Sequence, residues 1–313
     1  MTEAFRHLVS IKDLDRSIIT RILDRADVLI EHGPDNTMLA GRTVLNLFFE
    51  PSTRTRTSFE LAARRLGALV VNFDTAHSST RKGETLIDTL HTLEAMQIDA
   101  LVVRHKNPGT PGFLAHHARS KVAVINAGDG HQAHPTQGLL DVLTIRQQRS
   151  DLSSLKVAIC GDIAHSRVAR SDIHALQGLG VAELRLCGPR SLLPEAGEVP
   201  GCSLHTDFDA AIEGVDVVIM LRLQVERMMS EQVPDTDAYY RDFGLGPARL
   251  QKAAADCLVL HPGPINRGIE IAPEVADGPQ SQILRQVRNG VAVRMAVLAE
   301  LLDPPQSATR SPS

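Results

Sequence analysis

Residues 44–60 read VLNLFFEPSTRTRTSFE, an apolar run followed by a polar turn and then by a helical pattern. The run from Val44 to Phe49 consists mainly of aliphatic and aromatic side chains, which is typical of a buried strand. Ser52 precedes the helical pattern that begins near Thr53, and serine is a favoured helix N-cap. This stretch therefore predicts one strand-to-helix unit of a parallel α/β sheet.

The same alternation continues along the chain after an opening amphipathic helix at Leu14–Glu31. It favours an α/β fold with two doubly wound domains, each with a mainly parallel sheet of about four strands. Further helices are expected to begin near Glu84, Gly112 and Thr136. The strands are expected at Val44–Phe49, Leu69–Phe73, Ala100–Arg104 and Val122–Asn126, and at Lys156–Cys160, Glu183–Cys187, Asp216–Leu221 and Cys257–His261.

A polar joint at Arg149–Ser154 separates the two sets of strands. We expect a first domain over residues 1–148 and a second domain over residues 149–282, with the active site in the interdomain cleft. The last helical pattern, Ile283–Leu302, carries an apolar stripe at helical spacing, which requires a packing partner. We expect this helix to pack back onto the first domain.

Composition excludes several classes of protein. Of the 313 residues, 43% are hydrophobic and 22% charged, and no apolar run is long enough to cross a bilayer. The net charge is −4 and only 3% of residues are aromatic, so the basic, stacking surface of a nucleic-acid binder is missing. The polar N-terminus favours a cytoplasmic location. The four cysteines form no C-x-x-C pair and are interpreted as core thiols.

Cationic side chains follow the expected strands of the first half, where an open α/β sheet binds its ligands. Arg54 lies in the first turn of the helix after the first strand, where a cation opposes the helix dipole unless an anion is bound. Ser52 taken by itself is better explained as a helix cap. Arg104 ends the third strand and His134 opens a later helix, so both belong to the same sheet edge. This edge predicts a phosphate cradle with a group that polarises a carbonyl.

The second half repeats this placement of cations. Arg167 follows its first strand, Arg222 follows its third, and His261 to Pro264 follow its fourth. Each arginine taken alone is more often a solvated surface residue, but together they indicate a second anionic ligand. No G-x-S-x-G elbow, Walker A lysine loop, H-E-x-x-H or clean G-x-G-x-x-G is present, which favours group transfer by proximity and electrostatics.

At this level of detail the chain resembles the aspartate/ornithine carbamoyltransferase family over its whole length. FFEPSTRTRTSFE at residues 48–60 is similar to the carbamoyl-phosphate signature of that family. KGET at residues 82–85, HPTQ at residues 134–137 and HPGP at residues 261–264 follow in the expected order. Gly263 departs from some members, which carry leucine there, but either residue acts through its backbone.

The resemblance implies a role for particular residues. Carbamoyl phosphate is expected to be held by Ser52, Thr53, Arg54, Thr55, Arg104, His134, Gln137, Gly263 and Pro264. Aspartate is expected to be held by Lys82, Arg167, Arg222 and Gln224. Catalysis is assigned to Arg54, Thr55, Arg104, His134 and Lys82. Ser78 and Lys82 are expected from the neighbouring chain of a homotrimer with shared active sites, although the residues of the 77–82 loop taken alone favour a solvated connection.

The resemblance is greater to the aspartate branch of the family. Arg167, Arg222 and Lys82 suit the carboxylate of aspartate, whereas the ammonium of ornithine requires a carboxylate partner. In this chain His261 is followed by Pro262, whereas the corresponding segment of the ornithine branch resembles His-Cys-Leu-Pro. The expected products are N-carbamoyl-L-aspartate and phosphate, an early step of pyrimidine biosynthesis, with no cofactor, metal, nucleic acid or membrane.

Three alternatives stay open: ornithine carbamoyltransfer, a nicotinamide-dependent oxidoreductase and a non-catalytic structural homologue. The segment after Gly161 lacks the glycines of a dinucleotide site, and the joint retention of Arg54, Lys82, Arg104 and His134 disfavours a non-catalytic chain. Whether a regulatory chain or a dihydroorotase partner binds is left open.

Overall fold

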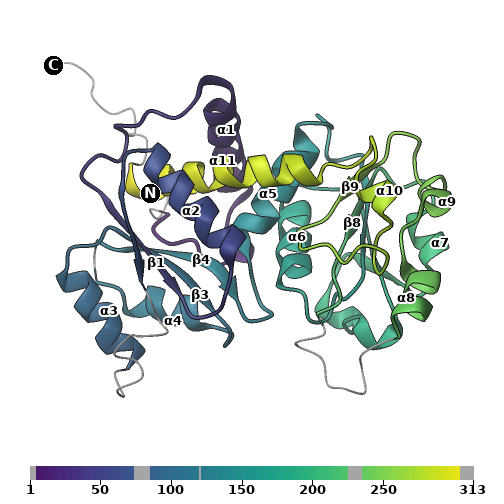
Figure 1. Cartoon of the computed structure of the whole chain (residues 1–313), viewed down its shortest axis with the longest axis horizontal. Helices are drawn as coiled ribbons and strands as arrows, with labels where there is room; N and C mark the ends of the chain where they lie inside the picture. Colours follow the sequence, from purple (N-terminus) through teal and green to yellow (C-terminus); the bar gives the residue numbers. More distant parts are fainter. Residues whose placement is uncertain (1–4, 74–84, 120, 225–234, 304–313) are drawn as a thin grey trace. The chain divides into compact units, whose positions relative to one another are not determined.

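The computed structural model describes residues 5–73, 85–119, 121–224 and 235–303. The chain divides into two compact units (Figure 1). The first unit comprises Met1–Thr136 and Gly290–Ser313, and the second comprises Gln137–Asn289. Ser78 and Lys82 lie outside the described residues.

The first unit contains a four-stranded sheet in which all neighbouring strands are parallel. Its strand order is β2-β1-β3-β4, and each of the three connections between consecutive strands contains a helix, as parallel strands require. All four strands expected from the sequence of this half are present, and their ends differ from the expected ones by at most three residues. They are β1 (Thr43–Phe48), β2 (Leu69–Phe73), β3 (Ala100–His105) and β4 (Ala123–Asp129).

Helices cover both faces of this sheet. In Figure 1, α3 (Leu86–Ala95) and α4 (Thr110–His117) lie on one face, while α1 (Arg16–His32) and α2 (Thr53–Arg65) lie on the other. The layer of α3 and α4 covers the face to which alternate strand residues direct their apolar side chains. Side chains that pack together under α3 and α4 include Leu45, Leu47, Leu90, Leu93, Leu101, Val103, Leu114, Val122 and Val124.

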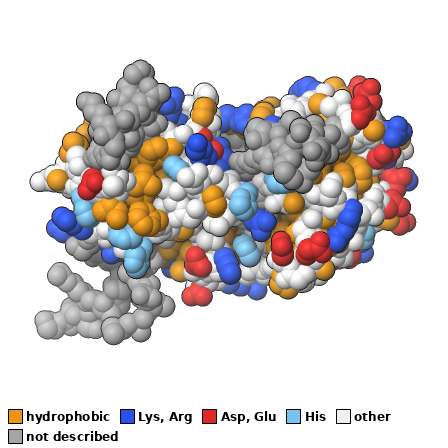
Figure 2. Space-filling model, turned by 90° about the horizontal axis from the view of Figure 1, so that it is seen from below, with side chains coloured by type: hydrophobic (Ala, Val, Ile, Leu, Met, Phe, Trp, Pro, Cys, Tyr) orange, Lys and Arg blue, Asp and Glu red, His pale blue; other side chains and the backbone are white. Residues whose placement is uncertain are grey.

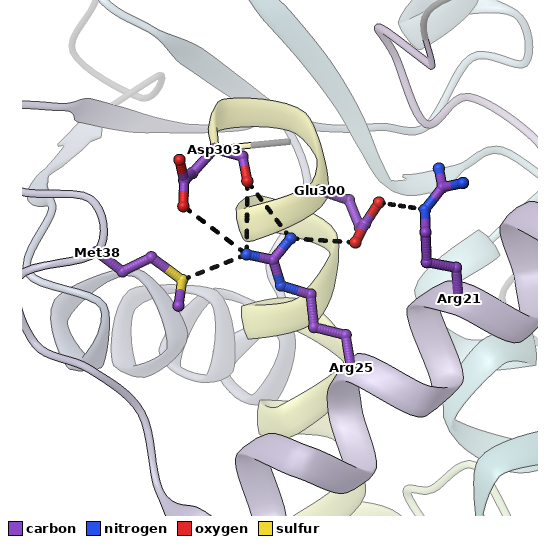
Figure 3. A network of polar contacts seen from close by, with 5 residues as sticks. All are labelled: Arg21, Arg25, Met38, Glu300 and Asp303. Carbon is purple, nitrogen blue, oxygen red and sulfur yellow. Dashed lines mark hydrogen bonds and ion pairs between the residues drawn. The ribbon is translucent and has the colours of Figure 1, made fainter. Parts of the chain in front are cut away.

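The C-terminal helix α11 (Ile283–Leu302) returns to the first unit in its second half. Glu300 is only 3% exposed, and its carboxylate accepts hydrogen bonds from Arg21 Nε at 2.6 Å and Arg25 at 3.0 Å (Figure 3). The Arg294 guanidinium lies 5.1 Å from the centroid of the Phe59 ring on α2. These contacts hold residues 290–302 of α11 against α1 and α2.

The second unit contains a five-stranded parallel sheet with the order β7-β6-β5-β8-β9. Four of its strands were expected from the sequence, and β7 (Cys202–His205) was missed. This edge strand has a single aliphatic residue and none of its side chains is buried, so it carries no apolar run. The other strands are β5 (Lys156–Cys160), β6 (Glu183–Cys187), β8 (Val217–Met220) and β9 (Leu258–Leu260).

A single apolar core fills one face of the second sheet beneath α7 (Phe208–Ile212), α9 (Pro247–Leu250) and α10 (Pro273–Ala276). It includes the buried thiols of Cys160, Cys187 and Cys257, as the interpretation as core thiols requires, but Cys202 on edge strand β7 is half-buried and lies outside this core. Burial raises the pKa of the Cys160 thiol well above its usual value. The remaining elements are α5 (Pro135–Arg146), α6 (Arg167–Gly178), α8 (Thr236–Phe243) and short 3₁₀ turns at Ile11–Asp13, Arg190–Leu192 and Ala196–Glu198.

In the ranges that the structure describes, no helix combines the length and apolar character needed to span a bilayer. On the face shown in Figure 2, basic and acidic side chains are interspersed over the second unit.

Candidate functional site

The backbone N–H groups at the start of α2 receive no hydrogen bond acceptor from the side chain of the N-cap residue, Ser52. The Ser52 side chain makes no capping hydrogen bond, and the first turn of α2 contains no acidic residue. Arg54 is exposed in that turn and Thr55 is buried. Backbone N–H groups at a helix start attract anions, and a guanidinium there supplies further donors. The helix-cap explanation of Ser52 is therefore the weaker one.

Arg104 is held at the end of β3. Its Nε lies 2.7 Å from Oε1 of Glu50, and its NH1 donates to the Ala127 carbonyl at 3.1 Å. The side chain is 12% exposed. Burial lowers the pKa of His105, the next residue, despite the neighbouring Glu50 carboxylate. Glu50 is thus the partner that orients Arg104, a role that sequence reasoning did not assign to it.

His134 is positioned by a tight connection between β4 and α5. Asp129 accepts a hydrogen bond from the Gly109 amide at 2.8 Å, and its own amide donates to the Ala133 carbonyl at 2.9 Å. Gly130 has a φ of +47°, and a Cβ there would lie 2.9 Å from the Pro108 nitrogen, so only glycine fits. His134 follows this turn with 6% exposure.

In the second unit, Gln137 lies in the first turn of α5 and is 8% exposed. Its Nε2 donates to Oδ1 of Asp141 at 3.0 Å and to Oδ2 at 3.2 Å. The side-chain amide is therefore fixed by a carboxylate one turn along the same helix. Sequence reasoning identified Gln137 but not Asp141.

Arg167 is the first residue of α6 and is only 5% exposed. Ser166 caps this helix by accepting a hydrogen bond from the Ala169 amide at 3.1 Å. Like the exposed Arg54, the buried Arg167 places a guanidinium in the first turn of a helix, where a cation opposes the helix dipole. This placement supports an anionic ligand at this edge rather than a solvated surface arginine.

Arg222 and Gln224 follow β8 on either side of Leu223, which is buried with Leu192 and Tyr239. The backbone N–H of Gln224 donates to Oδ2 of Asp162 at 3.1 Å. The other carboxylate oxygen of Asp162 accepts from His165 Nδ1 at 2.8 Å. Asp162 thus fixes the backbone of this segment. The signal for it in the sequence is an aspartate directly after strand β5, on the edge already singled out.

The HPGP segment is folded around buried His261. Its Nδ1 accepts a hydrogen bond from the Gly263 amide at 2.8 Å, so Nε2 carries the proton and faces Glu270 Oε1 at 3.1 Å. Glu270 also accepts from the Asn266 amide at 2.6 Å. The Gly263-Pro264 peptide is cis and Gly263 has a φ of +66°. Glu270 is a second organising carboxylate that the sequence motifs do not reveal.

The structure therefore assembles two groups of the residues expected from the sequence. At the carboxyl edge of the first sheet it places Ser52, Thr53, Arg54, Thr55, Arg104 and His134. In the second unit Arg167, Arg222, Gln224, Gly263 and Pro264 follow strand ends, and Gln137 is tied to the same unit through Asp141. Each group is rich in cations and N–H donors, so each suits an anion.

Two family models match the chain. The aspartate/ornithine carbamoyltransferase carbamoyl-P binding domain matches residues 6–147, and the Asp/Orn binding domain of the same family matches residues 153–301.

Curated relatives named aspartate carbamoyltransferase catalytic subunit are similar over nearly the whole chain. The protein from Stenotrophomonas maltophilia (strain R551-3) is 56% identical over 303 residues, which cover 95% of this chain and 96% of the relative. The protein from Xanthomonas euvesicatoria pv. vesicatoria is 57% identical over 302 residues, with the same coverage.

Solved structures agree on the fold. Aspartate transcarbamoylase from Trypanosoma cruzi in complex with carbamoyl aspartate and phosphate has a TM-score of 0.85 at 31% identity, covering 94% of this chain and 95% of that one. Ornithine carbamoyltransferase from Thermus thermophilus has a TM-score of 0.84 at 26% identity, covering 94% and 98%. The backbone alone therefore does not separate the two branches.

Proposed function

The chain belongs to the aspartate/ornithine carbamoyltransferase family, and we propose that it transfers the carbamoyl group of carbamoyl phosphate to the amino group of L-aspartate. The products are N-carbamoyl-L-aspartate and phosphate. The observation that carries this assignment is the 56–57% identity to curated catalytic subunits of aspartate carbamoyltransferase over 95% of the chain. Similar TM-scores to both branches make sequence identity, rather than fold, the deciding observation.

In this mechanism the phosphate of carbamoyl phosphate binds at the N-terminus of α2. The uncapped first turn, with Ser52, Thr53, Arg54 and Thr55, supplies backbone and side-chain donors. Arg54 takes up the charge that grows on the phosphate as it leaves. The exposure of Arg54 leaves its guanidinium accessible to such a ligand.

The carbonyl carbon of the carbamoyl group is the electrophile. Arg104, His134 and Thr55 stabilise the oxyanion that forms when the neutral α-amino group of aspartate attacks this carbon. A C–N bond forms, the C–O bond to phosphate breaks, and the proton that the amino nitrogen loses passes to the departing phosphate. The ion pair of Arg104 with Glu50 holds its guanidinium in place before the substrate arrives, which lowers the cost of orientation.

Aspartate is assigned to the second unit. Arg167, Arg222 and Gln224 there, together with Lys82, match an amino acid with two carboxylates. Arg167 is almost fully buried at the start of α6, which holds its guanidinium in place for a specific contact with one carboxylate. Gln137, Gly263 and Pro264 complete the contacts to the carbamoyl end.

We further propose a homotrimer in which Ser78 and Lys82 act in the site of the neighbouring chain. Edge strand β2 supports an association, because Leu69 and Val71 on it are 64% and 38% exposed. The reaction belongs to an early step of pyrimidine biosynthesis. A cytoplasmic location follows from its phosphorylated substrate, since such an anion does not cross a bilayer unaided.

The test is a turnover assay on the purified chain with carbamoyl phosphate and either L-aspartate or L-ornithine, with detection of the carbamoylated amino acid. We expect saturable formation of carbamoyl aspartate and no carbamoyl ornithine (citrulline). Turnover with ornithine alone would assign the chain to the other branch. No turnover with either, from a folded trimer, would favour a non-catalytic homologue.

A further inference from the structure

Asp141 is the centre of a buried polar cluster formed by α5, α6 and α11 in the second unit. Asp141 and Asp172 are both 0% exposed, Gln286 is 2% exposed and Gln137 is 8% exposed. Oδ1 of Asp141 accepts hydrogen bonds from Gln286 Nε2 at 2.6 Å and from Gln137 Nε2 at 3.0 Å. Two side-chain amides from distant parts of the sequence therefore meet on one carboxylate oxygen.

The backbone determines which way these amides are turned. The amide of His261 donates to Oε1 of Gln286 at 2.9 Å, and a backbone N–H can only donate. Gln286 must therefore present its Nε2 group to Asp141, which makes Oδ1 an acceptor. An acceptor at Oδ1 in turn requires Gln137 to present Nε2 to it. The Oε1 atom of Gln137 is left as an acceptor on the other side of its amide.

Asp172 supports this arrangement. Both of its carboxyl oxygens are buried, and neither makes a hydrogen bond within the described residues. Burial, and then the negative charge of Asp141, raise the pKa of Asp172 well above its usual value. The raised pKa favours the neutral form of Asp172, which adds no charge repulsion beside Asp141, and Oδ1 of Asp141 accepts from both glutamines.

The same carboxylate also reaches the HPGP segment. Gln286 connects Asp141 to the amide of His261, and His261 Nδ1 accepts from the amide of Gly263. Gln137 and the Gly263-Pro264 backbone are the groups assigned above to the carbamoyl end of the substrate. Both are thus tied to Asp141 by continuous hydrogen bonds within one unit.

We propose that Asp141 is a positioning residue for substrate selection: by holding the Gln137 amide with Oε1 outward, it makes the site favour an acyl phosphate that carries an NH₂ group over acetyl phosphate. This inference rests on the proposed function, in which Gln137 contacts the carbamoyl group. Carbamoyl and acetyl phosphate share the phosphoryl group and carbonyl and are close in size. They differ in an NH₂ that donates to Oε1 and a CH₃ that does not, and an unmatched buried acceptor disfavours binding.

The test compares dissociation constants of carbamoyl phosphate and acetyl phosphate for the trimeric wild-type chain and for Asp141→Asn, measured by calorimetry. In the variant, the amide oxygen of the new side chain keeps the Oδ1 position beside Gln286, and its NH₂ takes the position of Oδ2, which in the wild type accepts from Gln137 Nε2 at 3.2 Å. Two NH₂ groups then oppose each other, which favours a Gln137 amide that is turned over with Nε2 outward. We expect the preference for carbamoyl phosphate to fall by roughly 10- to 100-fold, chiefly through weaker carbamoyl phosphate binding. A purely structural effect would weaken both ligands equally, because both share the phosphate anchor.

Asp172→Asn is the matched control, because it makes the same chemical change at the other fully buried carboxyl group of the cluster, which makes no hydrogen bond with Gln137 in the described residues. We expect its preference to stay within about twofold of wild type. The effect of Asp141→Asn should also vanish in a Gln137→Leu background, since Asp141 acts through Gln137. If Asp141→Asn does not fold, Asp141→Ser, whose hydroxyl either donates or accepts, replaces it and should also lower the preference.

A folded Asp141 variant that keeps the wild-type preference within twofold would overturn the role of Asp141. A wild-type chain that binds carbamoyl phosphate no better than acetyl phosphate would overturn it as well. A wild-type chain that binds neither phosphate would instead contradict the proposed function, so the two failures are distinguishable.

Discussion

The guanidinium of Arg104 and the carboxylate of Glu50 form an ion pair, with 2.7 Å between Nε and Oε1, at the carboxyl ends of adjacent strands β3 and β1. Glu50 lies at the start of the polar turn that leads into α2, so one side chain of that turn orients a residue 54 positions further along the chain. Both side chains are mostly buried, at 12% exposure for Arg104 and 20% for Glu50. Limited exposure to water makes the pair stronger than a surface ion pair.

Glu50→Gln should therefore reduce catalysis without unfolding the chain. The substitution removes the charge that holds Arg104, and we expect kcat to fall by about 10-fold or more because the oxyanion donor is no longer preorganised. Steady-state kinetics with both substrates and a thermal melt measure this. The exposed acid Glu31 on α1 provides the control Glu31→Gln, which should leave kcat unchanged. An unaltered kcat in Glu50→Gln would show that Arg104 does not depend on this pair.

Arg54→Ala should lose most of its turnover while the fold survives. Removal of one preorganised donor to developing charge costs about 10²- to 10³-fold in kcat. The side chain is exposed, so its loss opens no cavity. The control is Arg65→Ala, an exposed arginine in the last turn of the same helix. If Arg54→Ala kept more than half of the wild-type kcat, the phosphate cradle at α2 would be excluded.

Arg222→Ala should mainly raise the KM for aspartate. Arg222 belongs to the second unit and is assigned to a carboxylate of aspartate, so the dissociation constant of carbamoyl phosphate should remain nearly constant. Loss of a charge-assisted hydrogen bond predicts a rise in KM of roughly 10- to 100-fold. Initial rates over a range of aspartate concentrations give KM, and calorimetry gives the carbamoyl phosphate affinity. Equal losses for both substrates would contradict this division between the units.

Mixed trimers test the shared site. Homotrimers of Lys82→Ala and of Arg54→Ala should each be nearly inactive. A hybrid trimer of both variants contains one interface at which both wild-type residues meet, so activity should recover to about a third of wild type per hybrid. The two variants are dissociated, reassociated together and assayed for carbamoyl aspartate. No recovery in confirmed hybrids would mean that Lys82 acts within its own chain or takes no part in catalysis.

His7 should make the first unit less stable in mild acid. Its Nδ1 accepts a hydrogen bond from the Val124 amide at 3.0 Å, and burial, with a smaller effect of Arg6, lowers its pKa from 6.5 to about 4. Between these values the unfolded chain binds more protons than the folded chain, so the free energy of unfolding falls as pH decreases from about 6.5 to about 4.

His7→Asn, which does not titrate, should therefore show a smaller drop in Tm between pH 7.5 and pH 5 than the wild-type chain. The Asn side-chain oxygen can still accept a hydrogen bond. His32→Asn is the control, because the His32 side chain is 67% exposed. Identical pH dependences of Tm for His7→Asn and wild type would exclude this role of His7.

Local sequence patterns determined most of the fold. The eight expected strands are present, and α11 spans the residues of the apolar stripe at Ile283–Leu302. The turn at residues 50–55 predicted the start of α2 as a candidate anion site, because helix capping and the helix dipole depend on neighbouring residues. Strand β7 was missed because an exposed edge strand of four residues needs no apolar pattern.

Only the tertiary structure decided how the candidate residues are held. Asp162 fixes Gln224 across 62 residues, and Gln286 meets Asp141 across 145 residues. Buried carboxylates and amides must find hydrogen-bond partners, but several arrangements of partners satisfy the same sequence. Which arrangement forms depends on the packing of α5, α6 and α11, and that packing arises from contacts between distant segments. The sequence therefore predicts which residues contact the substrates, and the packed structure determines how each of them is oriented.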